Sequence, residues 1–542
     1  MNIAEHICNY LALYQVRYIF GYPGAAILPL MDAINKHPSL EWVLMRSEST
    51  AALAASAQGK LTKKLSVCAS TCGPGVTNLL TGLLDAQLDH SPVLVLSGLP
   101  ITNKHSLGHF QSVDQLKLTD ACCGFNAICE HPAQVPQLLQ TAVGYIMRYN
   151  RPAHLAITPD LQLTKLTRSE LKSARLHYQH LHRNIQLYRP PEMALDVVAN
   201  TINSFKKIVI GVGARAYGAG KDIESFAEKI CAPMISTFAG KGVIREDHPL
   251  YLGILGLFGA PANRLALEGI REAEVIITFG VDDLIYLLTD KDVDQTRELI
   301  QCEPNFSLLD YQFINKRMLL GDIAEIASGL ATKVKSHSTI SGKKSQHSSP
   351  PSKVKKKSTY VSQELFFNKL NNFIDTQKTI IALDIGDSTV WATKCLKLNQ
   401  RQSVLVSNRL GVMGFCLPAL IAAKLTKPDA RVVGIIGDGA LQMVLADLLT
   451  ATQCNLNIII IVFCNNVLQR VAAQQKEKYG VDLVNPDYYS LAKSCHITGI
   501  DINNNNEIEE KLNEAFSIAK GPILVAVYTD PNVFAPMSQW NN

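Results

Sequence analysis

The sequence has few of the features that mark membrane, secreted or zinc-binding proteins. No apolar run approaches the roughly 18 residues that a membrane-spanning helix needs, which predicts no membrane span. Residues 1–20 lack a basic segment followed by an unbroken apolar core, so they do not resemble a signal peptide. The 13 cysteines show no paired spacing typical of zinc sites or disulfide frameworks, which favours reduced thiols in a cytoplasmic protein.

Basic residues are concentrated in one segment only. Residues 333–357 carry eight lysines and no acidic residue. Without those lysines, 44 basic residues face 47 acidic ones, so the rest of the chain is slightly acidic. A nucleic-acid-binding surface needs clustered lysine and arginine, and no such stripe occurs elsewhere. We therefore expect no nucleic-acid partner, and we interpret the lysines as part of a solvated linker.

Apolar residues, by contrast, are abundant and regularly placed. They make up 47% of the 542 residues, and only 18% are charged, as in globular proteins of several domains. Short apolar runs alternate with helical patterns, which predicts parallel sheets covered by helices on both faces. These runs lie at 41–45, 65–70, 91–98, 206–213, 232–237, 273–280, 379–386, 430–439, 456–466 and 521–531.

The expected fold class is α/β, with three doubly wound parallel-sheet domains. Two polar segments, 166–190 and 333–360, lack an apolar period and are typical of linkers. They predict domains at 1–165, 190–332 and 361–542, with 333–360 as a flexible linker rich in lysine and serine.

The third region contains a carboxylate between two glycines. Gly437, Asp438 and Gly439 follow an apolar strand, at the sheet edge where open α/β sheets bind ligands. Twenty-five residues separate Gly439 from the pair Asn465 and Asn466, a length that fits one crossover helix and one return strand. Aspartate and asparagine oxygens at one edge suit Mg²⁺, which often completes its coordination with phosphate oxygens. The spacing therefore predicts a diphosphate site.

An aspartate between glycines, followed at this distance by paired asparagines, resembles the cofactor-anchoring motif of thiamine-diphosphate enzymes. The resemblance implies that Asp438, Asn466 and the backbone carbonyl of Leu468 bind the metal. It implies a pyrimidine-binding domain, a middle domain and a diphosphate-binding domain, in that order. Further segments are similar to the branch that contains acetolactate synthase and pyruvate oxidase: FGYPGAAILPLMDAI (20–34), TCGPGVTNLLTGLLDA (71–86), GHFQSVD (108–114) and LGVMGFCLPALIAAKL (410–425).

The resemblance also implies a catalytic acid. Glu48 precedes a helix of small residues and matches the glutamate that shares a proton with the cofactor's aminopyrimidine ring. Without the resemblance, the preferred interpretation of Glu48 is an acid that interacts with the dipole at a helix N-terminus. Met413 matches the bulky residue that holds the cofactor bent. The other matched cofactor contacts are Pro23, Gly24, Asn78, Gln111, Gly386, Asp387, Gly437, Gly439 and Ala440.

Several positions depart from acetolactate synthase. Gln475 stands where the synthases carry a tryptophan that selects the acceptor, and Gly124 falls near the place of a basic residue. The pair Gly386 and Asp387 resembles pyruvate oxidase more than the synthases. The reaction that follows decarboxylation therefore depends on features that the sequence leaves open.

Flavin binding in the middle domain is a second open alternative. Segments 211–220 and 252–259 resemble flavin-binding segments, with Arg215 as the best single contact. However, FGVDD (279–283) lacks an arginine common there, and QCEP (301–304) replaces a more acidic ribose-binding segment. The glycines fit an FAD site and also fit a Rossmann-like domain without flavin.

The leading hypothesis is a thiamine-diphosphate- and Mg²⁺-dependent transferase that decarboxylates pyruvate and joins the product to a second 2-oxo acid. Such a reaction belongs to branched-chain amino acid biosynthesis. The alternative is an oxidoreductase of the pyruvate-oxidase type that passes electrons to FAD. A non-catalytic scaffold is disfavoured because Glu48 and Asp438 are both present. The resemblance also implies a homodimer or homotetramer, since family sites lie between subunits, and it is compatible with a small regulatory subunit.

Overall fold

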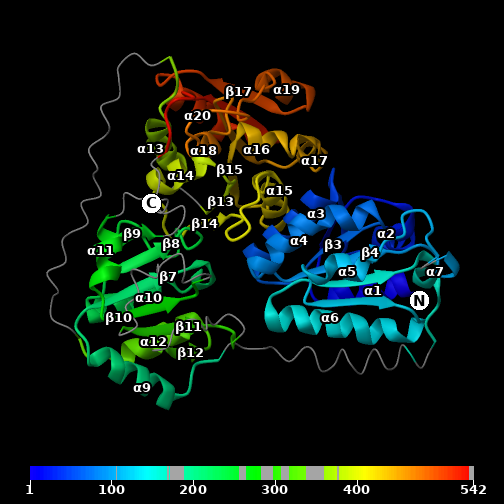
Figure 1. The fold of residues 1–542 in the computed structure, drawn as a ribbon, viewed down its shortest axis with the longest axis horizontal. Coiled ribbons are helices and arrows are strands. Elements are labelled where there is room, and N and C mark those ends of the chain that lie inside the picture. Colours follow the sequence, from blue (N-terminus) through cyan, green and yellow to red (C-terminus); the bar gives the residue numbers. More distant parts are fainter. Residues whose placement is uncertain are drawn as a thin grey trace.

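The computed structural model describes residues 1–104, 107–167, 170, 188–255, 264–281, 297–306, 316–336, 359–374 and 378–535. Within these ranges the chain forms three sheets, each of six parallel strands, in three lobes (Figure 1). The predicted α/β class with three parallel-sheet domains is therefore confirmed. Most of segments 166–190 and 333–360, predicted as linkers, lies outside the described residues.

The N-terminal sheet has the strand order β2-β1-β3-β4-β6-β5. Alternate residues of its strands face opposite sides: Ile19 and Val67 pack in one buried cluster, whereas Phe20 and Cys68 pack in another. The strands are β1 (Tyr18–Gly21), β2 (Glu41–Leu44), β3 (Ser66–Ser70), β4 (Val93–Gly98), β5 (Phe125–Cys129) and β6 (Ala153–Ile157). The helices are α1 (Ile3–Leu13), α2 (Leu28–Lys36), α3 (Glu48–Thr62), α4 (Pro74–Leu88), α5 (Gln115–Asp120), α6 (Val135–Tyr149) and α7 (Pro159–Leu163).

The middle sheet has the order β12-β11-β10-β7-β8-β9. Its strands are β7 (Ile208–Val212), β8 (Met234–Thr237), β9 (Tyr251–Leu255), β10 (Val275–Phe279), β11 (Glu298–Glu303) and β12 (Lys316–Leu320). The described helices are α9 (Glu192–Asn203), α10 (Gly220–Ile230), α11 (Arg264–Glu272) and α12 (Ile323–Lys333).

The C-terminal sheet, β14-β13-β15-β16-β18-β17, repeats the topology of the N-terminal sheet. Its strands are β13 (Thr379–Leu383), β14 (Gln402–Leu405), β15 (Arg431–Gly437), β16 (Ile459–Cys464), β17 (Thr498–Ile502) and β18 (Ile523–Tyr528). Its helices are α13 (Gln363–Ile374), α14 (Asp387–Cys395), α15 (Cys416–Thr426), α16 (Asp438–Gln442), η7 (Leu445–Asp447), α17 (Leu448–Gln453), α18 (Gln469–Ala472), α19 (Tyr488–Ser494) and α20 (Ile508–Ser517).

The prediction of one continuous crossover helix between β15 and β16 was wrong. The crossover consists of α16, the 3₁₀ turn η7 and α17. Asp447, at the break, is buried and accepts hydrogen bonds from the backbone N–H of Arg46 (2.9 Å) and the hydroxyl of Thr450 (2.9 Å). A contact with the N-terminal lobe thus interrupts a segment whose local pattern favours a helix.

Helix α3 joins the N-terminal and C-terminal lobes. It packs between α4 of its own lobe and α15 of the C-terminal lobe, and residues of all three helices share one apolar core (Figure 1). Gly82 lets α3 and α4 approach closely, since a Cβ atom built on it would lie 2.5 Å from the Cβ of Ala52 and 2.7 Å from the nitrogen of Leu53. No helix in the described part of the chain is long and apolar enough to span a membrane.

The α3–α4 contact generates a stability prediction. Gly82→Ala should lower the melting temperature, because the added methyl group meets the backbone of α3 and overpacking costs about 1–3 kcal/mol. Gly144→Ala is the matched control: this glycine is exposed in α6 and its Cβ position is open, so the change should stabilise by about 0.5–1 kcal/mol. Thermal denaturation of both variants measures the two melting temperatures. Equal changes in melting temperature would show that α3 and α4 are not in close contact at Gly82.

Candidate active site in two halves

The first half of the site lies at the carboxyl ends of β1, β2 and β3. Pro23 and Gly24 follow β1, and Glu48 follows β2 as the first residue of α3. A Cβ atom built on Gly24 would lie 2.4 Å from the Cβ of Thr71, and one built on Gly75 would lie 3.5 Å from Oε1 of Glu48. The fold therefore brings three predicted segments together around one carboxylate.

Glu48 lies at the start of α3, and one of its two carboxylate oxygens accepts a hydrogen bond within the protein. Ser47 caps the helix by accepting the N–H of Ser49 (3.2 Å), and the side-chain amide of Asn78 donates to Oε2 of Glu48 (3.0 Å). The residue is only 8% exposed. No described group donates to Oε1, so this oxygen is available to a donor from a bound cofactor. This arrangement fits the predicted contact with an aminopyrimidine ring.

Gln111 lies at the same edge of the sheet. A Cβ atom built on Gly73 would lie 2.8 Å from the Cβ of Gln111, and the thiol of Cys72 lies 3.7 Å from Oε1 of Gln111. Gly73 has φ +59°, so this position also favours glycine by its backbone conformation. The loop after β4 is thus packed on the loop after β3.

The second half of the site is centred on Asp438, at the end of β15. Its Oδ2 accepts the backbone N–H groups of Asn465 (2.9 Å) and Asn466 (2.8 Å), and its Oδ1 accepts the N–H of Gly439 (2.8 Å). The carboxylate is 3% exposed. Since β15 and β16 are adjacent and parallel, the 25-residue spacing brings Asp438 and Asn466 to one edge, as predicted.

Asn485 also belongs to this half of the site and was not predicted from the sequence. Its side-chain amide donates to Oδ2 of Asp438 (2.7 Å) and to Oδ1 of Asn466 (2.6 Å), while Gln442 donates to its Oδ1 (2.6 Å). The two oxygens predicted to bind the metal therefore converge on one electropositive group. Asn485 lies in the loop before α19, where no spacing rule for metal ligands points to it.

These oxygens fit a magnesium ion, because they are hard donors that leave most of the coordination shell to phosphate and water. The described residues contain no group of three or more His, Cys, Asp and Glu side chains suited to a metal. The carbonyl of Leu468 accepts the N–H groups of Val471 (3.0 Å) and Ala472 (2.9 Å) and so begins α18. Metal binding by this carbonyl stays a prediction.

Met413 lies beside Gly439, the residue after Asp438. A Cβ atom built on Gly439 would lie 3.9 Å from the Cε of Met413. Asp384, at the end of β13, accepts the N–H groups of Gly414 (2.9 Å) and Cys416 (2.9 Å), which fixes the chain directly after Met413. Burial raises the pKa of the Asp384 carboxyl to about 6. The structure therefore places a partly buried methionine beside the glycine turn, and its contact with the cofactor stays a prediction.

The remaining predicted contacts of this half have different surroundings. Gly386 and Gly437 border open space, since a Cβ atom built on either meets nothing within 4 Å. Ala440 is buried in α16. The carboxylate of Asp387 accepts the N–H of Ala535 (2.9 Å), and burial raises the pKa of this carboxyl. Asp387 thus binds the C-terminal segment of its own chain.

Arg215 is engaged within the protein. Its guanidinium forms two hydrogen bonds of 2.8 Å with Glu303, a fully buried residue, and donates to the carbonyl of Val281 (2.7 Å). These bonds involve Nε and Nη2 of the guanidinium, and the predicted contact between Arg215 and a flavin stays a prediction. Of segment 252–259, also predicted to contact flavin, residues 256–259 lie outside the described residues.

The departures from acetolactate synthase also have structural counterparts. Both ends of the Gln475 side-chain amide bind the backbone of Tyr479, at 2.9 and 3.1 Å. A Cβ atom built on Gly124 would lie 1.7 Å from the hydroxyl oxygen of Tyr145, so no basic side chain fits there without a rearrangement. Neither position supplies the acceptor-selecting group of the synthases.

Comparison with known proteins agrees with this geometry. The chain matches the thiamine pyrophosphate enzyme family in three parts: the N-terminal TPP binding domain over 1–118, the central domain over 195–330 and the C-terminal TPP binding domain over 384–527.

Three relatives match nearly the whole chain. A probable acetolactate synthase large subunit of Methanococcus aeolicus is 30% identical over 98% of this chain and 92% of its own length. A putative thiamine pyrophosphate-containing protein of Bacillus subtilis is 28% identical over 95% and 90%, respectively. The pyruvate oxidase of Lactiplantibacillus plantarum is 27% identical over 96% and 87%. The chain therefore belongs to the thiamine-diphosphate-dependent enzymes, in the branch of acetolactate synthase and pyruvate oxidase.

Proposed function

We propose that this acetolactate synthase-like enzyme decarboxylates pyruvate with Mg²⁺ and thiamine diphosphate and joins the product to a second 2-oxo acid. The observation that carries the proposal is the convergence of Asp438 and Asn466 at one sheet edge. This pair supplies a clamp for a metal and its diphosphate, and Glu48 supplies an acid for the cofactor's other end.

Each half-site contributes a separate chemical task. When bound, thiamine diphosphate supplies the electron-accepting carbon that decarboxylation of a 2-oxo acid requires. Asp438 and Asn466 would hold the metal, and Met413 would pack against the cofactor. Glu48 would share a proton with the cofactor's aminopyrimidine ring through Oε1, and Asn78 orients the carboxylate through Oε2. Burial of Glu48 strengthens this interaction, since water competes little at 8% exposure.

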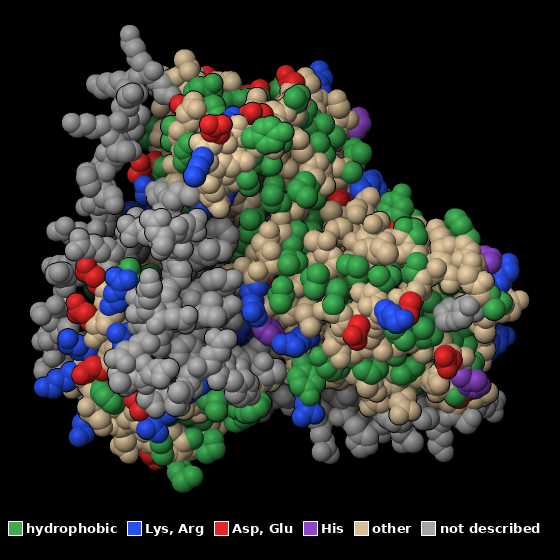
Figure 2. Space-filling view, viewed as in Figure 1, with side chains coloured by type: hydrophobic (Ala, Val, Ile, Leu, Met, Phe, Trp, Pro, Cys, Tyr) green, Lys and Arg blue, Asp and Glu red, His purple; other side chains and the backbone are tan. Residues whose placement is uncertain are grey.

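The complete site is proposed to form between two copies of the chain. No hydrogen bond among the described residues joins Glu48 to the group around Asp438. Large apolar side chains are exposed near both half-sites: Leu107 (76%) and Phe110 (79%) near the first, Met443 (65%) and Val484 (93%) near the second. Figure 2 shows hydrophobic side chains spread over the visible face of the N-terminal lobe and across its border with the C-terminal lobe. A homodimer would cover such surfaces and join Glu48 of one chain to Asp438 of the other.

Oxidation of the decarboxylated product is the second candidate function. The presence of Gly386 and Asp387, typical of pyruvate oxidase, and the similarity to a pyruvate oxidase favour it. The similarity to an acetolactate synthase large subunit, 30% identical over 98% of this chain, favours carbon–carbon bond formation.

Glu48→Gln tests the catalytic acid. The variant should bind thiamine diphosphate nearly as well as the wild type but lose at least about 100-fold in kcat, since an amide cannot exchange the proton. Stopped assays of pyruvate consumption measure this. Glu41→Gln, which changes the exposed first residue of β2, is the control and should retain full activity. Wild-type turnover in Glu48→Gln would remove the assigned role.

Asp438→Asn tests the metal clamp. Loss of the negative charge should weaken Mg²⁺ binding, in the presence of thiamine diphosphate, by at least about 100-fold. Electron paramagnetic resonance of Mn²⁺, used in place of Mg²⁺, measures the affinity directly. Asp429→Asn changes an exposed aspartate at the opposite end of β15 and should leave the affinity unaltered. Equal affinities in both variants would contradict the clamp.

Incubation with pyruvate separates the two candidate functions. The purified enzyme, supplied with Mg²⁺ and thiamine diphosphate without oxygen, should form acetolactate while any bound flavin stays oxidised. Bleaching of a flavin absorbance band, with acetate or acetyl phosphate as the product, would instead identify the oxidase reaction. Product analysis by mass spectrometry and the visible spectrum are recorded on the same sample.

A further inference from the structure

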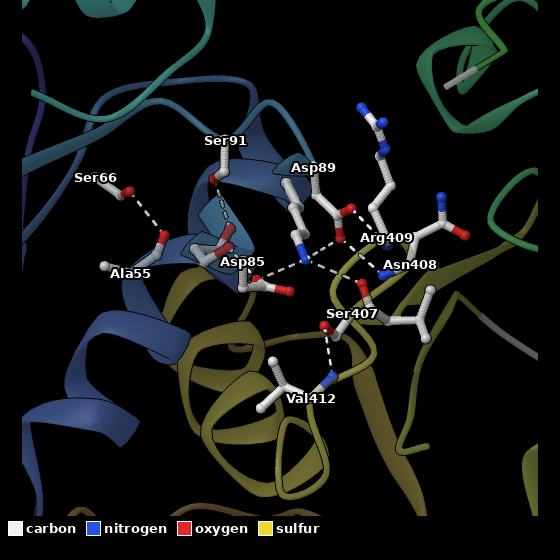
Figure 3. A network of polar contacts seen from close by, with 12 residues as sticks. Ala55, Ser66, Asp85, Asp89, Ser91, Ser407, Asn408, Arg409 and Val412 are labelled. Atoms are coloured by element: carbon white, nitrogen blue, oxygen red, sulfur yellow. Dashed lines mark hydrogen bonds and ion pairs between the residues drawn. The ribbon is translucent and has the colours of Figure 1, made fainter. Parts of the chain in front are cut away.

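Three charged side chains lie buried together where the N-terminal lobe meets the C-terminal lobe. Lys60, near the end of α3, forms ion pairs with Asp85 (2.8 Å) and Asp89 (2.6 Å), at the end of α4. Their side chains are 10%, 0% and 6% exposed, respectively. Figure 3 shows the two aspartates facing a loop of the C-terminal lobe that contains Ser407, Asn408 and Arg409.

This cluster binds the backbone of that loop. Asp89 accepts the N–H of Asn408 (2.8 Å) through Oδ2 and the N–H of Arg409 (2.9 Å) through Oδ1. Lys60 donates to the carbonyl of Val406 (3.0 Å), and its ammonium lies 4.5 Å from the ring centre of Phe415. Lys60 therefore touches both ends of the loop, while Asp89 holds one arm.

The loop carries Met413, the residue that lies over the glycine turn. Within the loop, the hydroxyl of Ser407 accepts the N–H of Val412 (2.9 Å), which ties the held arm to the residue before Met413 (Figure 3). Asp384 holds the other arm through Gly414. Two buried carboxylates therefore hold the loop on either side of Met413: Asp384 from its own lobe and Asp89 from the N-terminal lobe.

A buried cluster of charges contributes less to the stability of a fold than apolar residues in the same place would. Burying three charges costs desolvation free energy that apolar residues of similar size would avoid. Hydrogen bonds from backbone N–H groups to a carboxylate are, however, short and directional, so they fix a loop more tightly than apolar packing does. Burial raises the pKa of Asp85, and Ser56 donates to this carboxyl (2.6 Å), so the cluster has its own supporting contacts.

We propose that Lys60 and Asp89 are positioning residues for the cofactor. They hold the loop 406–412 and thereby keep Met413 in the position in which it would contact the bound cofactor. The proposal rests on the proposed function, because it assigns Met413 to the thiamine diphosphate site. It extends that function by giving the N-terminal lobe a part in shaping the diphosphate half of the same chain.

The test compares Asp89→Ala and Asp89→Asn with a matched control. Glu274 in the middle lobe also accepts two consecutive backbone N–H groups, of Lys206 (3.1 Å) and Lys207 (3.0 Å), far from Met413 in sequence and lobe. Glu274→Ala removes the same kind of interaction without touching the loop. For each full-length variant, thiamine diphosphate affinity is measured by calorimetry with saturating Mg²⁺, together with kcat, KM for pyruvate and the melting temperature.

Asp89→Ala should bind thiamine diphosphate about tenfold more weakly and lose about tenfold in kcat, with KM for pyruvate nearly unchanged. Asp89→Asn should recover part of both losses, because its one carbonyl oxygen still accepts an N–H group. Glu274→Ala should lower only the melting temperature. A pattern in which cofactor affinity falls only for Asp89 variants supports the proposal.

Asp89 variants that bind the cofactor within twofold of the wild type would overturn it and leave the cluster a structural role. If Asp89→Ala does not fold, Asp89→Asn decides by the same criterion. A wild-type protein that binds no thiamine diphosphate would overturn the proposed function itself, a result distinguishable because it appears before any variant is compared.

Discussion

The structure depends above all on one carboxylate, that of Asp438, which joins the ends of two parallel strands. By accepting the N–H groups of Asn465 and Asn466, it fixes the loop after β16 against the turn after β15. This junction places two hard oxygens side by side at the sheet edge. Because the strands are parallel and adjacent, the carboxyl ends of both open towards the same space, and the chemistry of the site follows from that.

Buried carboxylates hold the other loops of the C-terminal half in the same way. Asp384 accepts backbone N–H groups on one side of Met413, and Asp89 accepts them on the other. Asp447 accepts the N–H of Arg46 and breaks the crossover helix. In each case a charged acceptor satisfies backbone donors that no sheet or helix can satisfy, so the loops gain a defined shape without regular secondary structure.

Helix α3 connects the two halves of the molecule. It begins at Glu48 and carries Lys60 twelve residues later, about 18 Å along the helix axis. Its small residues allow close packing against α4 and α15, and Gly82 on α4 is one reason for the short distance. The proposed catalytic acid and the proposed anchor of the Met413 loop are therefore parts of one helix.

The sequence by itself determined the fold class, most of the strands and the meeting of Asp438 and Asn466 at one sheet edge, where we propose a metal clamp. These depend on local rules: apolar residues at short intervals form buried strands, and a fixed crossover length returns the chain to the same edge. Only the tertiary structure decided which side chains hold the loops. Asp89 meets Asn408 across 319 positions and Arg46 meets Asp447 across 401, and Asn485 approaches Asp438 from a separate loop. No spacing rule links such residues, because their proximity results from the packing of whole lobes rather than from the path of one strand and one helix.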